Sequence, residues 1–230
     1  MPDITLYSAR TCPFAQRTRL MLAIKQTGFE LTEIDLKNTP DWFHDISPYG
    51  KVPVLQHGDD RVWESAIINE YLEESYPQPA LLPSAPGERA YARFWIDFAN
   101  TQFVPLFYKV LLEQDPDRQR QRRDEMIEKL RFMENEGLGN PTAGDFWLGD
   151  QVSLVDLAFY PFFERFCVLE HYRQLQLPDD CPRLAAWWQR MTEQPAIREI
   201  ANPADFYIRS YRHYADGTAQ GRTAQEMRDH

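Results

Sequence analysis

The first third of the chain alternates short β-type runs with helical patterns. A helix is predicted where Pro13 opens a segment whose apolar residues share one face, and Gly28 ends that helix. A second helix is predicted over 65–76. Strands are predicted at 4–8, 30–36, 52–55 and 61–63. The order β-α-β, an irregular helix-bearing link and β-β-α favours a small mixed sheet covered by helices.

The remainder of the chain carries helical patterns and no clear strand pattern. Segment 77–86 contains four prolines, which is typical of a linker between domains. Long helices are predicted over 87–113, 118–136, 153–171 and 182–194. We therefore expect a mixed α/β domain over 1–76, the linker, an all-helical domain over 87–212, and a polar tail over 213–230 whose composition allows disorder.

The composition is that of a compact globular protein. The 230 residues are 43% hydrophobic and 26% charged, which suffices for a core without disulfides or metal ions. The 25 basic against 35 acidic residues give a charge of −10, which disfavours nucleic acid as a partner. The apolar runs are too short to cross a membrane, the N-terminus lacks the signal-peptide pattern, and three irregularly spaced cysteines indicate free thiols. We expect a cytoplasmic protein with no membrane partner.

Cys12 is the strongest candidate for chemistry because it lies where the first predicted strand leads into a helix. Pro13 fits the first helical turn, so Cys12 faces the unsatisfied backbone N–H groups and the positive end of the helix dipole. That setting favours a thiolate and lowers the pKa from its free value of about 8.5, and Arg10 and Arg17 add positive potential. The alternative is a packing role, since most lone cysteines are small buried apolar residues.

Ala15 stands where a second cysteine would complete a C-x-x-C dithiol. A disulfide formed at Cys12 must therefore be resolved by a thiol from solution, which implies a small-thiol co-substrate. Cys181 is interpreted as a loop residue and Cys167 as a packing residue. Cys167 and His171 stand four apart on a helix, but no further ligand follows at zinc spacing, so no metal site is predicted.

Two further motifs indicate a peptide-like ligand. At Pro53 the sequence fits a trans edge-strand proline and a cis Val52–Pro53 bond equally well, and the cis bond would turn the Val52 backbone toward an extended ligand. Ser65 opens a helix whose N–H groups can bind a carboxylate, and Glu64 can accept an ammonium group. An ordinary helix N-cap explains the second motif as well.

In this order and spacing, the three motifs resemble the thioredoxin-like glutathione site of the glutathione transferase superfamily. The segment 146–156 is similar to the hallmark helix start of that superfamily, with Ser153 and Asp156 as a capping box. The resemblance covers roughly residues 3–200 and implies a thioredoxin-like α/β N-terminal domain followed by an all-α C-terminal domain. The segments that most resemble the omega class are 12–17, 36–43 and 63–67.

The resemblance assigns glutathione, as co-substrate, to particular residues. It implies that Cys12 forms a mixed disulfide with glutathione, that Val52 pairs with the cysteinyl backbone, and that Lys51 meets the glycine carboxylate. It also implies packing by Phe14 and a cis bond at Pro53. The γ-glutamyl end is assigned to Glu64 and Ser65.

Three positions qualify this assignment. Omega enzymes usually have a lysine that contacts glutathione where this chain has Thr39, so we expect the glycine end to be held either more weakly or by Lys51 alone. Other transferases activate glutathione with a tyrosine or serine hydroxyl, and Tyr7 and Ser8 lie near that place. Because Cys12 is present, we interpret Tyr7 as strand packing.

The implied function is that of a glutathione-dependent thiol transferase, reducing disulfides, glutathionyl adducts or dehydroascorbate in a homodimer. The alternatives are a dehalogenase or ether-cleaving lyase on the same cysteine, and a non-enzymatic scaffold resembling stringent starvation protein A that binds RNA polymerase. The Cys-Pro-Phe sequence argues against the scaffold. The acceptor is expected to be a small apolar or aromatic electrophile or a disulfide. Its candidate site residues, each of which also fits core packing, are Phe98, Phe103, Phe107, Tyr108, Phe162, Arg165, Phe166, Tyr207 and Tyr211.

Overall fold

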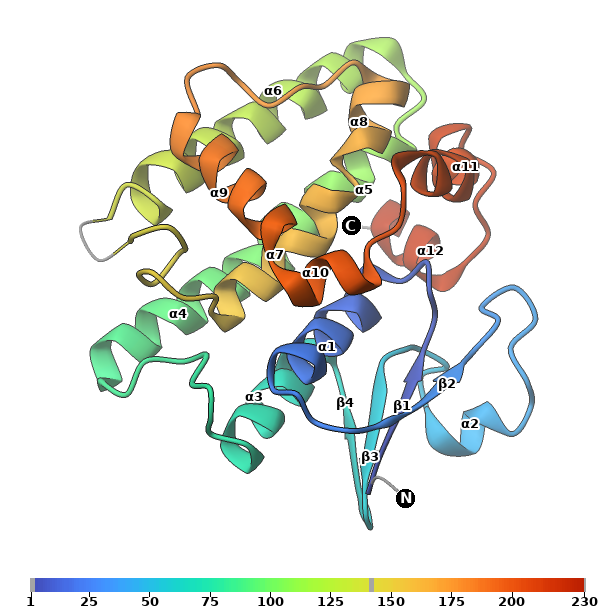
Figure 1. Ribbon diagram of the computed structural model, residues 1–230. Coiled ribbons are helices and arrows are strands. Elements are labelled where there is room, and N and C mark those ends of the chain that lie inside the picture. The colour runs from blue at the N-terminus through green and yellow to red at the C-terminus, as the bar shows by residue number, and fades with distance from the viewer. Residues whose placement is uncertain (1–2, 141–142, 230) are drawn as a thin grey trace. The chain divides into compact units, whose positions relative to one another are not determined.

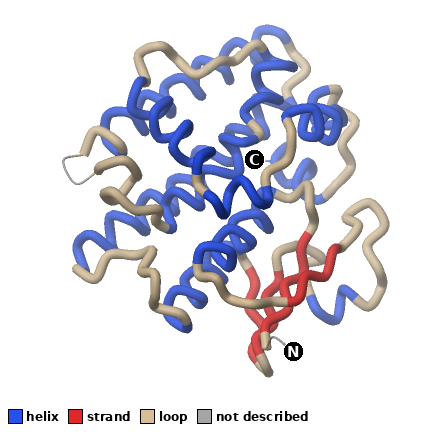
Figure 2. Tube along the Cα trace, in the orientation of Figure 1, coloured by secondary structure: helices blue, strands red, loops and turns tan. Residues whose placement is uncertain are grey.

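The computed structural model describes residues 3–140 and 143–229. The chain forms two compact units, Met1–Leu82 and Pro83–His230, and their boundary lies within the proline-rich segment 77–86. The four strands found in these described ranges, β1 to β4, lie in the first unit (Figure 2). None of the helices in the described residues combines the length and the apolar character needed to span a membrane.

The first unit is built on a mixed sheet with the strand order β2-β1-β3-β4 (Figure 1). β1 pairs in parallel with β2 and antiparallel with β3, which pairs antiparallel with β4. Helices α1 and α3 pack against each other, and α3 also contacts β3 and β4. The elements are β1 (Ile4–Ser8), α1 (Pro13–Ile24), β2 (Glu30–Glu33), α2 (Phe43–Ile46), β3 (Val54–His57), β4 (Asp60–Trp63) and α3 (Ser65–Ser75).

The second unit is helical, and α7 is its central element because nearly all of its residues are buried. α7 contacts α4, η1, α8 and α9. Its predicted capping box is confirmed, with the Ser153 N–H donating to the Asp156 carboxylate at 2.7 Å. The elements are α4 (Pro86–Phe98), the π-helical turn η1 (Ala99–Phe103), α5 (Val104–Leu112), α6 (Pro116–Phe132), the π-helical turn η2 (Met133–Gly137), α7 (Leu154–Glu164), α8 (Phe166–Arg173), α9 (Pro182–Glu193), α10 (Pro195–Ile200), α11 (Ala204–Ala215) and α12 (Arg222–Asp229).

The helix predicted over 153–171 is wrong in one respect, because it breaks into α7 and α8 at Arg165. The buried Arg165 guanidinium donates to the Pro161 carbonyl at 2.7 Å. In a continuing helix, the Arg165 backbone N–H would donate to this Pro161 oxygen. Here it donates to the Phe163 carbonyl instead. A side chain thus replaces one backbone bond of the helix, and the chain turns.

The structure also differs from the sequence prediction at a strand end and in the C-terminal tail. The strand expected over 30–36 ends at Glu33, because the Asp35 carboxylate accepts from the Lys37 N–H at 2.9 Å and forms a local turn. The polar tail over 213–230, whose composition allows disorder, continues α11 to Ala215 and contains α12, which packs on α5.

A buried ion pair fixes α1 relative to α3. The Lys25 ammonium lies 2.6 Å from the Glu73 carboxylate and 2.6 Å from the Pro79 carbonyl oxygen. The other carboxylate oxygen of Glu73 accepts from the N–H groups of Leu81 and Leu82. The pair therefore joins the C-terminus of α1, the last turns of α3 and the segment that follows them.

We predict that Lys25→Met destabilises the protein strongly, because it leaves the buried Glu73 carboxylate without its cation. The expected loss in the free energy of unfolding is about 3–5 kcal/mol. Chemical denaturation followed by circular dichroism measures it. Arg120→Met is the control, since it removes an exposed ion pair with Asp117 and is expected to cost less than about 1 kcal/mol. Similar losses for the two variants would contradict the anchoring role of Lys25.

Candidate functional site

Cys12 occupies the N-cap position of α1, between the end of β1 and the first helical turn. Its sulfur accepts a hydrogen bond from the Ala15 N–H at 3.5 Å, and as a thiol it donates to the Val52 carbonyl oxygen at 3.7 Å. Pro13 follows at the start of the helix, where its missing N–H costs no hydrogen bond. The sulfur therefore lies at the positive end of the helix, a setting that favours negative charge.

Cys12 is also part of the core of the first unit, since only 9% of the residue is exposed. It packs in an apolar cluster whose members include Ala9, Ala15, Phe43 and Val54. The packing role and the chemical role are thus compatible in this structure. What distinguishes Cys12 from an ordinary core cysteine is the backbone N–H that bonds to its sulfur.

Cys181 is a useful comparison because it also precedes a proline and also takes an N-cap position, that of α9. Among the described residues, its sulfur caps no N–H group of the helix. The buried Glu134 carboxylate accepts from the N–H groups of Arg183 and Leu184 instead, at 3.1 and 2.8 Å. Burial, reinforced by neighbouring carboxylates, raises the pKa of the Cys181 thiol to about 11. The same Cys-Pro sequence therefore produces opposite electrostatic settings at the two helix starts.

The Val52–Pro53 peptide bond is cis, which decides between the two conformations that the sequence left open. Val52 is 7% exposed and precedes Val54, the first residue of the β3 ladder, so its backbone lies outside the sheet pairing. Its carbonyl points at the Cys12 sulfur. Ser47 holds the loop that precedes Val52. Its hydroxyl accepts from the Lys51 N–H at 2.9 Å and donates to the Lys51 carbonyl at 2.8 Å.

Glu64 and Ser65 form the turn from β4 into α3. Glu64 has a φ of 64°, a conformation that costs a non-glycine residue on the order of 1–3 kcal/mol and is concentrated at functional sites. Its side chain is exposed, whereas Ser65 is 5% exposed. The Ser65 hydroxyl accepts a hydrogen bond from the Arg17 guanidinium at 3.4 Å. The turn thus presents an exposed carboxylate beside a helix N-terminus.

The predicted acceptor-site residues are all buried in the second unit. Phe107 packs edge-on against Phe162, and Tyr108 stacks on Tyr211. Phe166 belongs to a different cluster, where it packs against Phe163 and Trp188. Phe98 and Phe103 contact Phe159. In this structure these side chains form the aromatic core of the helical unit.

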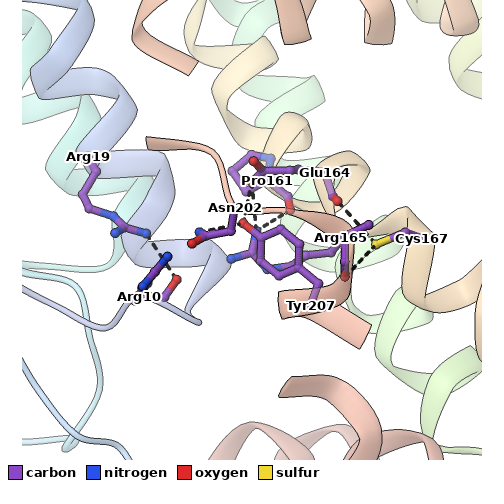
Figure 3. Close-up of polar contacts among 9 residues, drawn as sticks. Arg10, Arg19, Pro161, Glu164, Arg165, Cys167, Asn202 and Tyr207 are labelled. Atoms are coloured by element: carbon purple, nitrogen blue, oxygen red, sulfur yellow. Dashed lines mark hydrogen bonds and ion pairs between the residues drawn. The ribbon is translucent and has the colours of Figure 1, made fainter. Parts of the chain in front are cut away.

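Arg165 is the charged member of this buried group. Figure 3 draws it beside Glu164 and Tyr207. Its guanidinium carbon lies 4.3 Å from the centroid of the Tyr207 ring, and a nitrogen lies 3.7 Å from the Glu164 carboxylate. The Tyr207 hydroxyl donates to Glu164 at 2.7 Å and accepts from the Asn202 amide at 3.2 Å. These contacts join the α7–α8 break to α11.

Asn69 is a polar residue at the site that sequence reasoning missed. It lies one helical turn after Ser65, is 4% exposed, and its amide donates to the Arg17 carbonyl at 3.4 Å. An asparagine between the apolar positions Ile68 and Leu72 was the available signal, because a polar residue on a buried helix face needs a partner. Within residues 3–140 and 143–229, no group of three His, Cys, Asp or Glu side chains is arranged to hold a metal ion.

Two family models match the chain. The model of the glutathione S-transferase N-terminal domain matches residues 6–80, and that of the glutathione S-transferase C-terminal domain matches residues 115–190. Curated relatives include glutathione S-transferase omega-1 of Sus scrofa, which is 33% identical over 86% of this chain and 80% of its own length. Omega-1 of Mus musculus is 34% identical over 92% and 84% of the two chains.

Solved structures agree with these matches. Glutathione transferase Omega 3C from Trametes versicolor superposes with a TM-score of 0.85 at 28% identity, covering 96% of this chain and 94% of its own. A rice glutathione transferase solved in complex with glutathione gives a TM-score of 0.85 at 29% identity, over 95% and 98% of the two chains. The similarity therefore extends through both units and reaches beyond the omega class.

We predict that iodoacetamide at pH 7.5 modifies Cys12 well before the other two thiols. Burial raises the pKa of Cys167 and of Cys181 to about 11, so roughly one in 3,000 of either thiol is a thiolate at that pH. Peptide mass spectrometry over time measures each site separately, and Cys12→Ser is expected to abolish the fast modification.

The pH dependence provides the control. At pH values below the pKa, the fraction of a thiol present as thiolate increases tenfold per pH unit. The modification of Cys167 and Cys181 should therefore accelerate about 100-fold between pH 7.5 and 9.5. Faster modification of Cys181 than of Cys12 at pH 7.5 would show that the Cys12 sulfur is not the reactive one.

Proposed function

The chain belongs to the glutathione S-transferase family, with similarity to its omega class, and from this premise we propose that it is a cysteine-type enzyme that transfers thiols with glutathione as co-substrate. One observation carries the proposal: the Cys12 sulfur takes the N-cap position of α1 and accepts the Ala15 N–H. A thiolate there attacks sulfur, whereas a hydroxyl in its place would only activate bound glutathione.

The proposed reaction has two balanced exchange steps. The Cys12 thiolate attacks the glutathionyl sulfur of a mixed disulfide, forms a Cys12–glutathione disulfide and expels the acceptor thiolate, which takes a proton from solvent. The thiolate of a second glutathione then attacks the glutathionyl sulfur, releases glutathione disulfide and returns Cys12 as a thiolate. In the net reaction the mixed disulfide and one glutathione give the free acceptor thiol and glutathione disulfide.

The structure offers groups that suit glutathione at each end. The Val52 backbone, outside the sheet pairing and beside the Cys12 sulfur, suits the cysteinyl backbone of an extended tripeptide. The N-terminus of α3 at Ser65 suits the γ-glutamyl carboxylate, and the exposed Glu64 carboxylate suits its ammonium group. Lys51, on the loop held by Ser47, is proposed to hold the glycine carboxylate.

The remaining assignments follow from family membership. Phe14 and Pro53 are proposed to shape the glutathione pocket around these groups. The acceptors are proposed to be disulfides, glutathionyl adducts or dehydroascorbate, and the enzyme is proposed to act as a cytoplasmic homodimer, as glutathione transferases typically form dimers.

We predict that mixing the protein with glutathione disulfide adds one glutathione, at Cys12. Intact-mass spectrometry should show a single adduct that Cys12→Ser lacks and that free glutathione removes. In a coupled assay with a glutathionylated peptide, Cys12→Ser is expected to lose at least about 1,000-fold in rate, because the hydroxyl that replaces the thiol is not ionised at neutral pH. Cys181→Ser is the matched control and should retain full activity.

The alternatives give different results in the same assays. A lyase or dehalogenase would form the Cys12 adduct but would turn over an ether or haloaromatic substrate and not the glutathionylated peptide. A reactive, alkylatable Cys12 that never accepts glutathione would contradict the proposal altogether.

A further inference from the structure

A buried polar layer lies between α1 and α3, the two helices that pack against each other in the first unit. Arg17, Asn69 and Ser65 form it, and they are 2%, 4% and 5% exposed. Burying an arginine is costly unless its donors are used, so a guanidinium at this depth indicates a specific role. It lies five residues after Cys12 on the same helix.

Arg17 contacts one residue from each half of the proposed glutathione site. Its guanidinium carbon lies 5.2 Å from the centroid of the Phe14 ring, three residues earlier on α1. One of its nitrogens donates to the Ser65 hydroxyl oxygen at 3.4 Å, across the helix interface. The Asn69 amide bonds the Arg17 carbonyl at 3.4 Å and so fixes this part of α1 against α3.

The direction of the Arg17–Ser65 bond is fixed by chemistry. A guanidinium has five donors and no acceptor, so Ser65 must accept from Arg17 and must donate its own hydrogen elsewhere. The charged donor also polarises the hydroxyl and makes it a stronger donor. Ser65 is the first residue of α3, where the backbone N–H groups have no partners within the helix.

We propose that Arg17 is a positioning residue that aims the Ser65 hydroxyl at the carboxylate of the bound γ-glutamyl group. This inference rests on the proposed glutathione site. Because Arg17 is only 2% exposed, the proposal gives it no direct contact with glutathione. It acts through Ser65, whose hydroxyl and neighbouring helix N–H groups together offer donors to one anion.

The experiment measures the binding of S-methylglutathione by isothermal titration calorimetry. This probe cannot form a disulfide, so it reports on the site without the Cys12 chemistry. We expect Arg17→Gln and Ser65→Ala each to weaken binding about tenfold. The double variant should be weakened by less than about threefold beyond Ser65→Ala, because without the Ser65 hydroxyl Arg17 has no donor left to position.

Arg19→Gln is the matched control. Arg19 is another buried arginine of α1, 8% exposed, and its contacts include the Arg10 carbonyl at 3.4 Å and Glu33 of β2 at 3.9 Å. It should weaken binding less than about twofold. If loss of a buried arginine from α1 simply disturbed the fold, Arg19→Gln and Arg17→Gln would weaken binding alike, and the inference would be overturned.

Two further outcomes would also overturn it. Additive losses in the double variant would mean that Arg17 acts independently of Ser65. Unchanged binding by Arg17→Gln, with slower alkylation of Cys12, would mean that it serves the thiol. Failure of the proposed function looks different, because the wild-type protein would then not bind S-methylglutathione or would bind it without accepting glutathione at Cys12.

Discussion

The start of α1 is the constraint on which the candidate site depends. A helix begins with backbone N–H groups that lack partners, and here the Cys12 sulfur accepts one of them, from Ala15. Pro13 removes another donor at no cost, and β1 places the whole turn beside Val52, which precedes the paired residues of β3. Sheet order and helix capping therefore bring the sulfur and the Val52 backbone together, although forty residues separate them.

Local sequence alone does not decide the chemistry of a cysteine. Cys12 and Cys181 both precede a proline at a helix start, yet the first donors of α9 are taken by the buried Glu134 carboxylate. A carboxylate there uses the donors that would otherwise favour a thiolate, and its charge opposes ionisation of the sulfur. At the start of α1, by contrast, the Ala15 N–H donates to the Cys12 sulfur. Among the described residues, no carboxylate accepts a hydrogen bond from that N–H.

The sequence predicted those parts of the fold and site that depend on short-range signals. The Cys-Pro helix start, the capping box of Ser153 and Asp156, and the two-part organisation all have signatures within a few residues. The break at Arg165 and the bond from Arg17 to Ser65 do not. The helix break depends on a guanidinium that donates to a backbone carbonyl, and the Arg17–Ser65 bond joins residues 48 positions apart. Contacts of this kind follow from packing, which periodicity does not encode.

Ala15 links the structural and chemical sides of the site. Its N–H bonds the Cys12 sulfur, and its side chain is fully buried in the apolar cluster around that sulfur. A cysteine at this position would place a second thiol one helical turn from the first and could resolve a disulfide within the protein. With a methyl group there, the protein keeps the donor that favours a thiolate but supplies no thiol of its own. On the proposed mechanism, the need for glutathione in the second step follows from that single side chain.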